Sequence, residues 1–187
     1  MAEGDRRRWD ARWREGGVIG APSPLITALD ELLPRSGRAL DVAGGPGRHA
    51  LWLARRGLEV TLVDVSPVAL ERAAAAAREA GLRLTTAEVD LDRAAPPAGP
   101  WDLVLQVHYV NRALTRRLAG ELAPGGLLVL LHPTRTNLER HERPSARFLL
   151  DDGEAAALAG PLDILRLDEG WLADGRHEAL LVARRPA

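Results

Sequence analysis

The sequence predicts one α/β domain, a mostly parallel sheet with helices on both faces. Two observations lead to this prediction. From Arg38 onward, short apolar or β-branched runs alternate with segments of helical periodicity, which is the pattern of repeated βα units. A glycine-rich loop also joins the first run to a helix, as in nucleotide-binding sheets. The length of 187 residues suits a single domain of ordinary size.

Seven segments have the composition of strands. No helical pattern separates the last two, and Asp174-Gly175 between them is a hairpin-turn signal, so the final strand should run antiparallel to its neighbours. The expected strands are residues 39–42, 59–63, 84–89, 103–107, 127–132, 162–167 and 178–183.

Helix signals fill the intervals between most of these strands. Ser23-Pro24 and Ser66-Pro67 are N-terminal capping signals, and Gly57 and Gly81 follow the last residues of helical patterns. Pro124-Gly125-Gly126 is expected to end a helix that carries Leu114, Leu118 and Leu122.

Two segments look irregular and are candidates for a lid over the site. Residues 1–21 precede a domain that spans residues 22–187, and they carry Trp9 and Trp13 on one expected helix face. The polar stretch 133–147 follows the end of a strand, where open α/β sheets bind ligands. We expect the first segment to fold over a bound cofactor.

Composition excludes several kinds of function. The chain has no cysteine, and its 25 basic residues are all arginine, so thiolate metal sites, cysteine nucleophiles and Schiff-base lysines are absent. A net charge of -1 argues against a nucleic-acid partner. We expect a cytoplasmic protein that does not bind membranes, because the chain has no long apolar run or signal peptide. We also expect a monomer or homodimer that acts on a small molecule, since one domain leaves no room for a module that docks a macromolecule.

The glycine loop Asp41-Val42-Ala43-Gly44-Gly45-Pro46-Gly47 and the acidic Asp64 predict a site for a nucleotide-like ligand. Asp64 closes the second strand, from which a carboxylate can bind both ribose hydroxyls. A dinucleotide also fits the loop, but its pyrophosphate would lie near Asp41, and Pro46 removes one N–H donor. A sulfonium and an ammonium suit Asp41 better, so S-adenosylmethionine is favoured over NAD(P).

These motifs resemble those of class I S-adenosylmethionine-dependent methyltransferases over residues 39–132. Ala43 departs from the pattern, since the family usually has a glycine there. The resemblance also rests on Val60-Thr61-Leu62-Val63-Asp64-Val65-Ser66, Val89-Asp90-Leu91, Trp101-Asp102-Leu103-Val104 and Leu122-Ala123-Pro124-Gly125-Gly126.

The whole chain is similar to the small methyltransferases of the tellurite-resistance type. The similarity implies a Rossmann-like methyltransferase fold with seven strands in the order 3-2-1-4-5-7-6 and strand 7 antiparallel. It rests on Trp9-Asp10-Ala11-Arg12-Trp13, residues 47–54, Phe148-Leu149-Leu150 with Gly153-Glu154, and residues 178–184.

The family resemblance implies roles for ten residues around S-adenosylmethionine, with S-adenosylhomocysteine as the product. Asp41 would attract the ammonium group, Asp64 would hold the ribose, and Asp90 would reach the adenine amino group. The implied cofactor-binding residues are Asp41, Ala43, Gly44, Gly45, Gly47, Asp64, Val65, Asp90, Leu91 and Gln106.

Methyl transfer from a sulfonium is an in-line displacement that mainly requires alignment of the reactants, so a general base is not obligatory. His108, Tyr109 and His132, at the ends of strands four and five, are candidates for positioning an acceptor or taking its proton. A thiol, an oxyanion or a small metabolite all suit this chemistry.

The substrate-binding candidates are Arg112, Arg147, Trp9 and Trp13. No metal is expected, because the five histidines do not form a H-E-x-x-H motif or a clustered spacing. An NAD(P)-dependent oxidoreductase and a non-catalytic adenosylmethionine-binding protein remain as alternatives.

Overall fold

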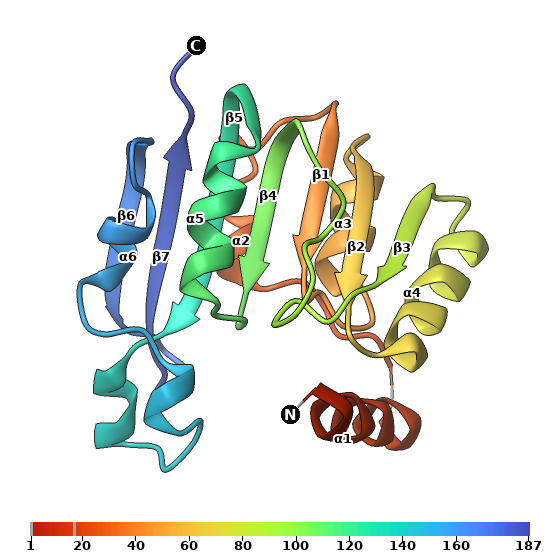
Figure 1. The fold of residues 1–187 in the computed structure, drawn as a ribbon, viewed down its shortest axis with the longest axis horizontal. Helices are drawn as coiled ribbons and strands as arrows, with labels where there is room; N and C mark the ends of the chain where they lie inside the picture. Colours follow the sequence, from red (N-terminus) through yellow and green to blue (C-terminus); the bar gives the residue numbers. More distant parts are fainter. Residues whose placement is uncertain (1, 17) are drawn as a thin grey trace.

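A seven-stranded sheet forms the centre of the protein (Figure 1). We describe it from a computed structural model that covers residues 2–16 and 18–187. The order β3-β2-β1-β4-β5-β7-β6 confirms the predicted topology. Strand β7 is antiparallel to both β5 and β6, while the pairs from β3 to β5 are parallel. The strands are β1 (Arg38–Val42), β2 (Glu59–Asp64), β3 (Leu84–Glu88), β4 (Trp101–Val107), β5 (Leu122–Pro133), β6 (Asp163–Trp171) and β7 (His177–Arg184).

Helices cover both faces of the sheet (Figure 1). Helices α2, α3 and α4 pack on one face, and α5 and α6 on the other. None of the helices within residues 2–16 and 18–187 is long and apolar enough to cross a bilayer. The helices are α1 (Ala2–Glu15), α2 (Pro24–Thr27), α3 (Arg48–Arg55), α4 (Pro67–Glu79), α5 (Arg112–Gly120) and α6 (Glu154–Leu158), with 3-10 helices η1 (Arg135–Glu139) and η2 (Ala146–Phe148).

Strand β5 explains why the central strands have continuous apolar sequences. Leu128 and Leu130 pack toward α5 and α6, whereas Val129 and Leu131 belong to the core beneath α2 and α3. A parallel strand with helices on both faces buries every side chain, so its sequence does not alternate. The two cores hold the carboxyl ends of β1, β2, β4 and β5 along one edge.

The predicted helix end at Pro124-Gly125-Gly126 is wrong. Helix α5 ends at Gly120, and Leu122 pairs with Trp101, so β5 begins five residues before the expected position of 127. The register shifts between Trp101 and Leu103, and Gly125 has a φ of 77°. A local irregularity of the strand therefore carries the proline and glycines that resemble a turn.

Both segments that looked irregular contain helices. Residues 2–15 form α1, and the stretch 133–147 contains η1 and the start of η2. Strand β6 also extends to Trp171, past the predicted end at 167, because its last residues pair with the start of β7. As the outermost strand, β6 exposes Ile164, Leu165 and Leu167, and its register shifts between Ile164 and Arg166.

Replacing Leu130 by Ala should lower the free energy of unfolding by about 2 to 5 kcal/mol, because Leu130 is fully buried in the central strand and leaves a cavity. Urea unfolding followed by circular dichroism measures this change. The control is Leu32→Ala, at an exposed leucine, which should cost less than about 0.5 kcal/mol. Equal losses in the two variants would contradict the assigned core.

Candidate active site

The glycine loop lies between β1 and α3 and has the backbone that its sequence predicts. Ala43, Gly45 and Gly47 have φ values of 53°, 56° and 87°, in the left-handed region. Ala43 accepts this conformation as a small residue, so the turn survives the loss of the usual glycine. A Cβ at Gly44 would lie 2.5 Å from Oδ2 of Asp41, which excludes larger residues there.

The buried Asp64 carboxylate at the end of β2 ties the glycine loop to the next connection. Its Oδ2 accepts a hydrogen bond from the Gly45 N–H (2.8 Å) and its Oδ1 accepts one from the Ser66 N–H (2.9 Å). Each oxygen retains further acceptor capacity. Burial raises the pKa of Asp64 despite these bonds. The carboxylate is therefore oriented as a ribose-binding group requires.

Asp41 is the most completely buried acid at the strand ends. Burial raises the pKa of Asp41 to about 7, and the charge of Asp64 adds to the increase. The backbone N–H of Ala50 opposes this increase, yet it lies outside hydrogen-bond geometry, and neither carboxylate oxygen has a partner within the described chain. A buried carboxylate without a partner suits a cationic ligand, because a cation would restore its lost solvation.

Helix α1 lies against the glycine loop. A Cβ at Gly45 would be 3.1 Å from Cζ2 of Trp13, whose ring stacks on that of Trp9 with centroids 6.2 Å apart. The Ser66 hydroxyl donates to Oδ1 of Asp10 (2.5 Å), so α1 is bonded to the residue that also holds Asp64. The Trp9 and Trp13 pair thus lies on the cofactor side of the site, as the lid hypothesis requires.

Residues expected around an adenine gather after β2 and β3. Val65 is half-buried, Leu91 is buried, and Asp90 is half-buried with its Oδ1 accepting from the Asp92 N–H (3.2 Å). The Asn111 side chain donates to the Leu91 carbonyl (3.3 Å), which fixes this connection to the one after β4. These contacts form a side wall for the cofactor-binding edge.

Gln106 has both ends of its amide engaged. Its Nε2 donates to the Tyr109 carbonyl (2.8 Å), and its Oε1 accepts from the Thr115 hydroxyl (3.0 Å). The amide retains a second N–H and a second oxygen lone pair, and the side chain is fully buried in the free protein. Gln106 holds the connection after β4 in place.

The three acceptor-positioning candidates point in different directions. Nε2 of His108 lies 3.0 Å from Oε1 of Glu178 on β7, whereas the Tyr109 hydroxyl donates to Asp92 (3.3 Å) on the adenine side. Burial raises the pKa of Tyr109, so its hydroxyl keeps its proton. Tyr109 therefore lies apart from His108, whereas His132 is close enough to His108 and Glu178 for their charges to influence its pKa.

His132 presents one open nitrogen at the end of β5. Its Nε2 lies 2.7 Å from the Phe148 carbonyl, which can only accept, so Nε2 carries the proton. Burial lowers the pKa of His132 to about 4, and Nδ1 has no partner among the residues described. His132 is thus a neutral imidazole with an unused acceptor.

Arg112 and Arg147 are less available to bind an anionic acceptor than the sequence predicts. Arg112 forms a two-point ion pair with Glu154 and also donates to the Leu149 carbonyl (3.1 Å). Arg147 is exposed, with its guanidinium over the Phe148 ring at 4.5 Å. The charge of Arg112 is already neutralised.

Comparison with known proteins decides the family. A family described as "Methyltransferase domain" matches residues 39–126. An uncharacterized methyltransferase of Mycobacterium bovis is 33% identical over 172 residues, which cover 87% of this chain and 68% of that protein. The chain belongs to the class I S-adenosylmethionine-dependent methyltransferases.

Other relatives of the methyltransferase match smaller parts. A tRNA 5-carboxymethoxyuridine methyltransferase of Escherichia coli is 32% identical over 133 residues, 66% of this chain and 51% of that protein. The first curated relatives are matched over 26% to 43% of their own length. The chain thus spans less than half the length of these first relatives.

Two solved structures have the same fold. Magnesium protoporphyrin IX methyltransferase from Synechocystis PCC 6803, with bound S-adenosylhomocysteine, has a TM-score of 0.73 at 18% identity and covers 98% of this chain and 99% of its own. TehB from Haemophilus influenzae has a TM-score of 0.74 at 18% identity, covering 95% and 67%. At this identity the tellurite-resistance subgroup stays a prediction.

The residues of the methyltransferase fit S-adenosylmethionine. The unpartnered Asp41 carboxylate faces the loop, Asp64 is oriented by two backbone amides, and a side chain at Gly44 would fill the turn. The cofactor would bring a sulfonium and an ammonium to a group of carboxylates that also includes Asp10. This charge pattern matches a cation better than a pyrophosphate.

Sequence reasoning missed two charged residues at this edge. Arg48, the first residue of α3, is half-buried and has no hydrogen bond or ion pair with the residues that the structure covers. Burial lowers the pKa of Arg48. The charge of Arg176 lowers it further, whereas the charges of Asp41 and Glu178 raise it. Glu178 is buried at the start of β7 and was noted only as part of a closing motif. No local pattern marks either residue, because their neighbours come from distant strands.

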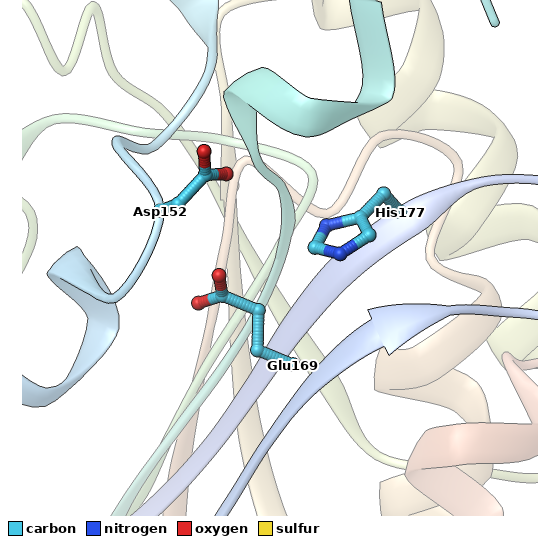
Figure 2. A group of neighbouring side chains, drawn as sticks. All are labelled: Asp152, Glu169 and His177. Atoms are coloured by element: carbon cyan, nitrogen blue, oxygen red, sulfur yellow. The ribbon is translucent and has the colours of Figure 1, made fainter. Parts of the chain in front are cut away.

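One group of side chains has the donors for a divalent cation. Asp152, Glu169 and His177 come from three segments, and their nearest ligand atoms lie within 4.8 Å of one another, facing a common space (Figure 2). Glu169 already accepts from the Gly153 N–H, and His177 Nδ1 contacts the Thr134 hydroxyl at 2.7 Å. The group is largely exposed and belongs to the β6–β7 side, away from the glycine loop.

Replacing Asp64 by Ala should weaken binding of S-adenosylhomocysteine on the order of tenfold to a hundredfold, because charge-assisted hydrogen bonds to the ribose are lost. Isothermal titration calorimetry measures the change. Asp163→Ala, at the opposite end of the sheet, is the control and should leave affinity within about twofold. Unchanged affinity in a folded Asp64 variant would remove this residue from the site.

Binding of S-adenosylhomocysteine should weaken about tenfold between pH 8 and pH 6. With a pKa of about 7, Asp41 is protonated at pH 6 and must lose its proton to face the ligand's ammonium group. Calorimetry across this range measures the trend. Asp41→Asn should bind more weakly at pH 8 and show a flat profile, and a variant with the wild-type slope would assign the titration to another group.

Proposed function

We propose that the protein transfers a methyl group from S-adenosylmethionine to a small-molecule acceptor. One observation supports a small acceptor above all: a cavity of about 200 Å³ opens beside Leu131 and Glu178, at the end of β5 and the start of β7. This volume suits a compact group, such as a small metabolite. A thiol, an oxyanion and a hydroxylated or amino metabolite are the classes considered.

The chain's contribution to the reaction is alignment and charge placement. When bound, the cofactor supplies an electrophilic methyl group on a sulfonium that is already a good leaving group. Asp41 and Asp64 would hold its ammonium and ribose, and the glycine loop would let its backbone approach closely. His132 alternates with Leu131 along β5, so its side chain points to the face of the sheet opposite to this cavity.

An RNA acceptor is the second candidate, because a relative is a tRNA methyltransferase. The net charge of -1 disfavours it, since phosphate contacts supply most of the affinity for nucleic acids. An NAD(P)-dependent oxidoreductase is disfavoured by the carboxylates of Asp10, Asp41 and Asp64 around the loop. A non-catalytic adenosylmethionine-binding protein would bind the cofactor without turnover.

Residues 1–21 form a cover for the cofactor in this proposal. Trp13 lies over Gly45, and the Arg72 guanidinium donates to the Trp13 carbonyl (2.6 Å). These contacts leave α1 attached mainly to α4 and the loop, and separate from the main core. A helix with so few buried apolar contacts opens at low cost in free energy.

The test of function combines binding and turnover. Calorimetry should give micromolar or tighter affinity for S-adenosylmethionine and no measurable heat with NAD. Release of S-adenosylhomocysteine is then followed with panels of small thiols, oxyanions, alcohols and amines, and with bulk tRNA. Turnover with tRNA alone would overturn the small-molecule proposal, and tight NAD binding would overturn the assignment of the cofactor.

Limited proteolysis tests the cover. Residues 1–21 should be cleaved in the free protein and protected by S-adenosylhomocysteine, because the ligand stabilises the closed position of α1. Deleting these residues should reduce turnover more than thermal stability. Identical cleavage with and without ligand, together with a large loss of melting temperature on deletion, would make α1 a permanent structural element.

A further inference from the structure

Glu178 is a buried carboxylate with one oxygen in use and one open. Its side chain is 1% exposed. Oε1 lies 3.0 Å from Nε2 of His108 and 2.9 Å from a guanidinium nitrogen of Arg176, while Oε2 has no hydrogen-bond partner among residues 2–16 and 18–187. A buried carboxylate oxygen left open is costly unless a ligand or solvent satisfies it.

Glu178 borders a cavity at the edge of the sheet. Its Oε2 is itself buried in the free protein, so a donor in the cavity would bind it after the carboxylate turns toward that space. Apolar side chains of Leu25, Leu131 and Leu180 form much of the wall, and the end of β6 completes it. Glu178 is the one acid on this wall that is buried, because Asp168 and Glu169 are exposed. The cavity thus combines an apolar body with a single buried acceptor, which is the usual composition of a small-molecule site.

This cavity opens on the same face of the sheet as the cofactor loop. Side chains alternate along a strand, and Ala39 and Leu180 belong to one core, so Asp41 and Glu178 share that face. Three strand spacings, roughly 14 Å, separate β1 from β7. Arg48, next to the loop, interacts electrostatically with both Asp41 and Glu178. A cofactor and a compact acceptor laid end to end span this distance.

The surrounding charges select the kind of group that Oε2 can bind. Arg176 and Arg48 already balance the Glu178 charge, which disfavours a second cation. An anionic group would add negative charge to a wall that already carries Asp168, Glu169 and Glu178. A neutral O–H or N–H donor gains a charge-assisted hydrogen bond without adding charge.

We infer that this cavity is the acceptor subsite, and that Glu178 selects acceptors in which a neutral hydroxyl or amine is attached to a small apolar body. The inference rests on the proposed function and narrows it, since oxyanions are disfavoured. Glu178 acts here by binding the acceptor, and His108 and Arg176 act as positioning residues that orient its carboxylate.

The test measures binding of three matched probes to the full chain saturated with S-adenosylhomocysteine. Phenol offers a donor, toluene offers none, and benzoate is an anion of similar size. Ligand-observed NMR titration should give phenol a dissociation constant at least about tenfold lower than that of toluene, because only phenol can form a charge-assisted hydrogen bond, and should show no binding of benzoate. Equal binding of phenol and toluene, or tight binding of benzoate, would overturn the inference.

Substitutions test whether Glu178 is the side chain that causes the preference for phenol over toluene. Glu178→Gln should reduce the preference for phenol over toluene at least about threefold, whereas Asp168→Asn, the same change on the exposed wall, should keep it. Leu25→Trp, at a half-buried position on that wall, should abolish binding of both probes and covers the case in which the Glu178 variant does not fold. Unaltered preference in a folded Glu178→Gln, or probe binding retained by Leu25→Trp, would place the acceptor elsewhere.

Titration of the same samples with S-adenosylhomocysteine distinguishes failure of the acceptor subsite from failure of the proposed function. If S-adenosylhomocysteine binds and the probes show no donor preference, the subsite is wrong and the cofactor assignment stands. If the cofactor itself does not bind, the proposed function fails together with the subsite.

Discussion

Asp64 is the residue on which the site depends, because its carboxylate holds two separate turns in one geometry. The Gly45 amide belongs to the loop after β1 and the Ser66 amide to the start of α4, and both donate to this one side chain. Ser66 in turn caps α4 through the Ala69 N–H and donates its hydroxyl to Asp10 of α1. The glycine loop, the start of α4 and the N-terminal helix are therefore linked through a single buried group.

A buried carboxylate of this kind is retained at a cost. Burial raises the pKa of both Asp41 and Asp64, so each acid is less stable as an anion here than in water. The core could be more stable with apolar residues at these positions. The cost is consistent with a site that gains its favourable charge interactions only when a cation binds, and Asp41, without a hydrogen-bond partner in the part of the chain described, is the clearer case.

The order of the sheet could be predicted because the motifs that carry the family resemblance are encoded locally, and the cofactor residues predicted from the same motifs stay a prediction. A loop with glycines at fixed spacing, an acid at the next strand end and a Ser-Pro cap all lie within short segments, and the hairpin turn at Asp174-Gly175 fixes the antiparallel strand. Glu178, Arg48 and the separate directions of His108 and Tyr109 could not be read, because they depend on which strands become neighbours and on a left-handed φ of 58° at His108. The early start of β5 was hidden for a related reason, since glycines permit both a turn and a strand irregularity.

The outer strand β6 bears on whether copies of the molecule can pair along the edge of the sheet. Ile164, Leu165 and Leu167 leave apolar side chains in water along a strand whose outer backbone groups face no further strand of this sheet. Such an edge is a template for intermolecular pairing, and thus for aggregation. The irregular register beside Ile164 and the charged Arg166 and Asp168, which pair with each other, interrupt that template. The edge is thereby protected by its own distortion and charge, the device that natural sheets use where no helix covers the last strand.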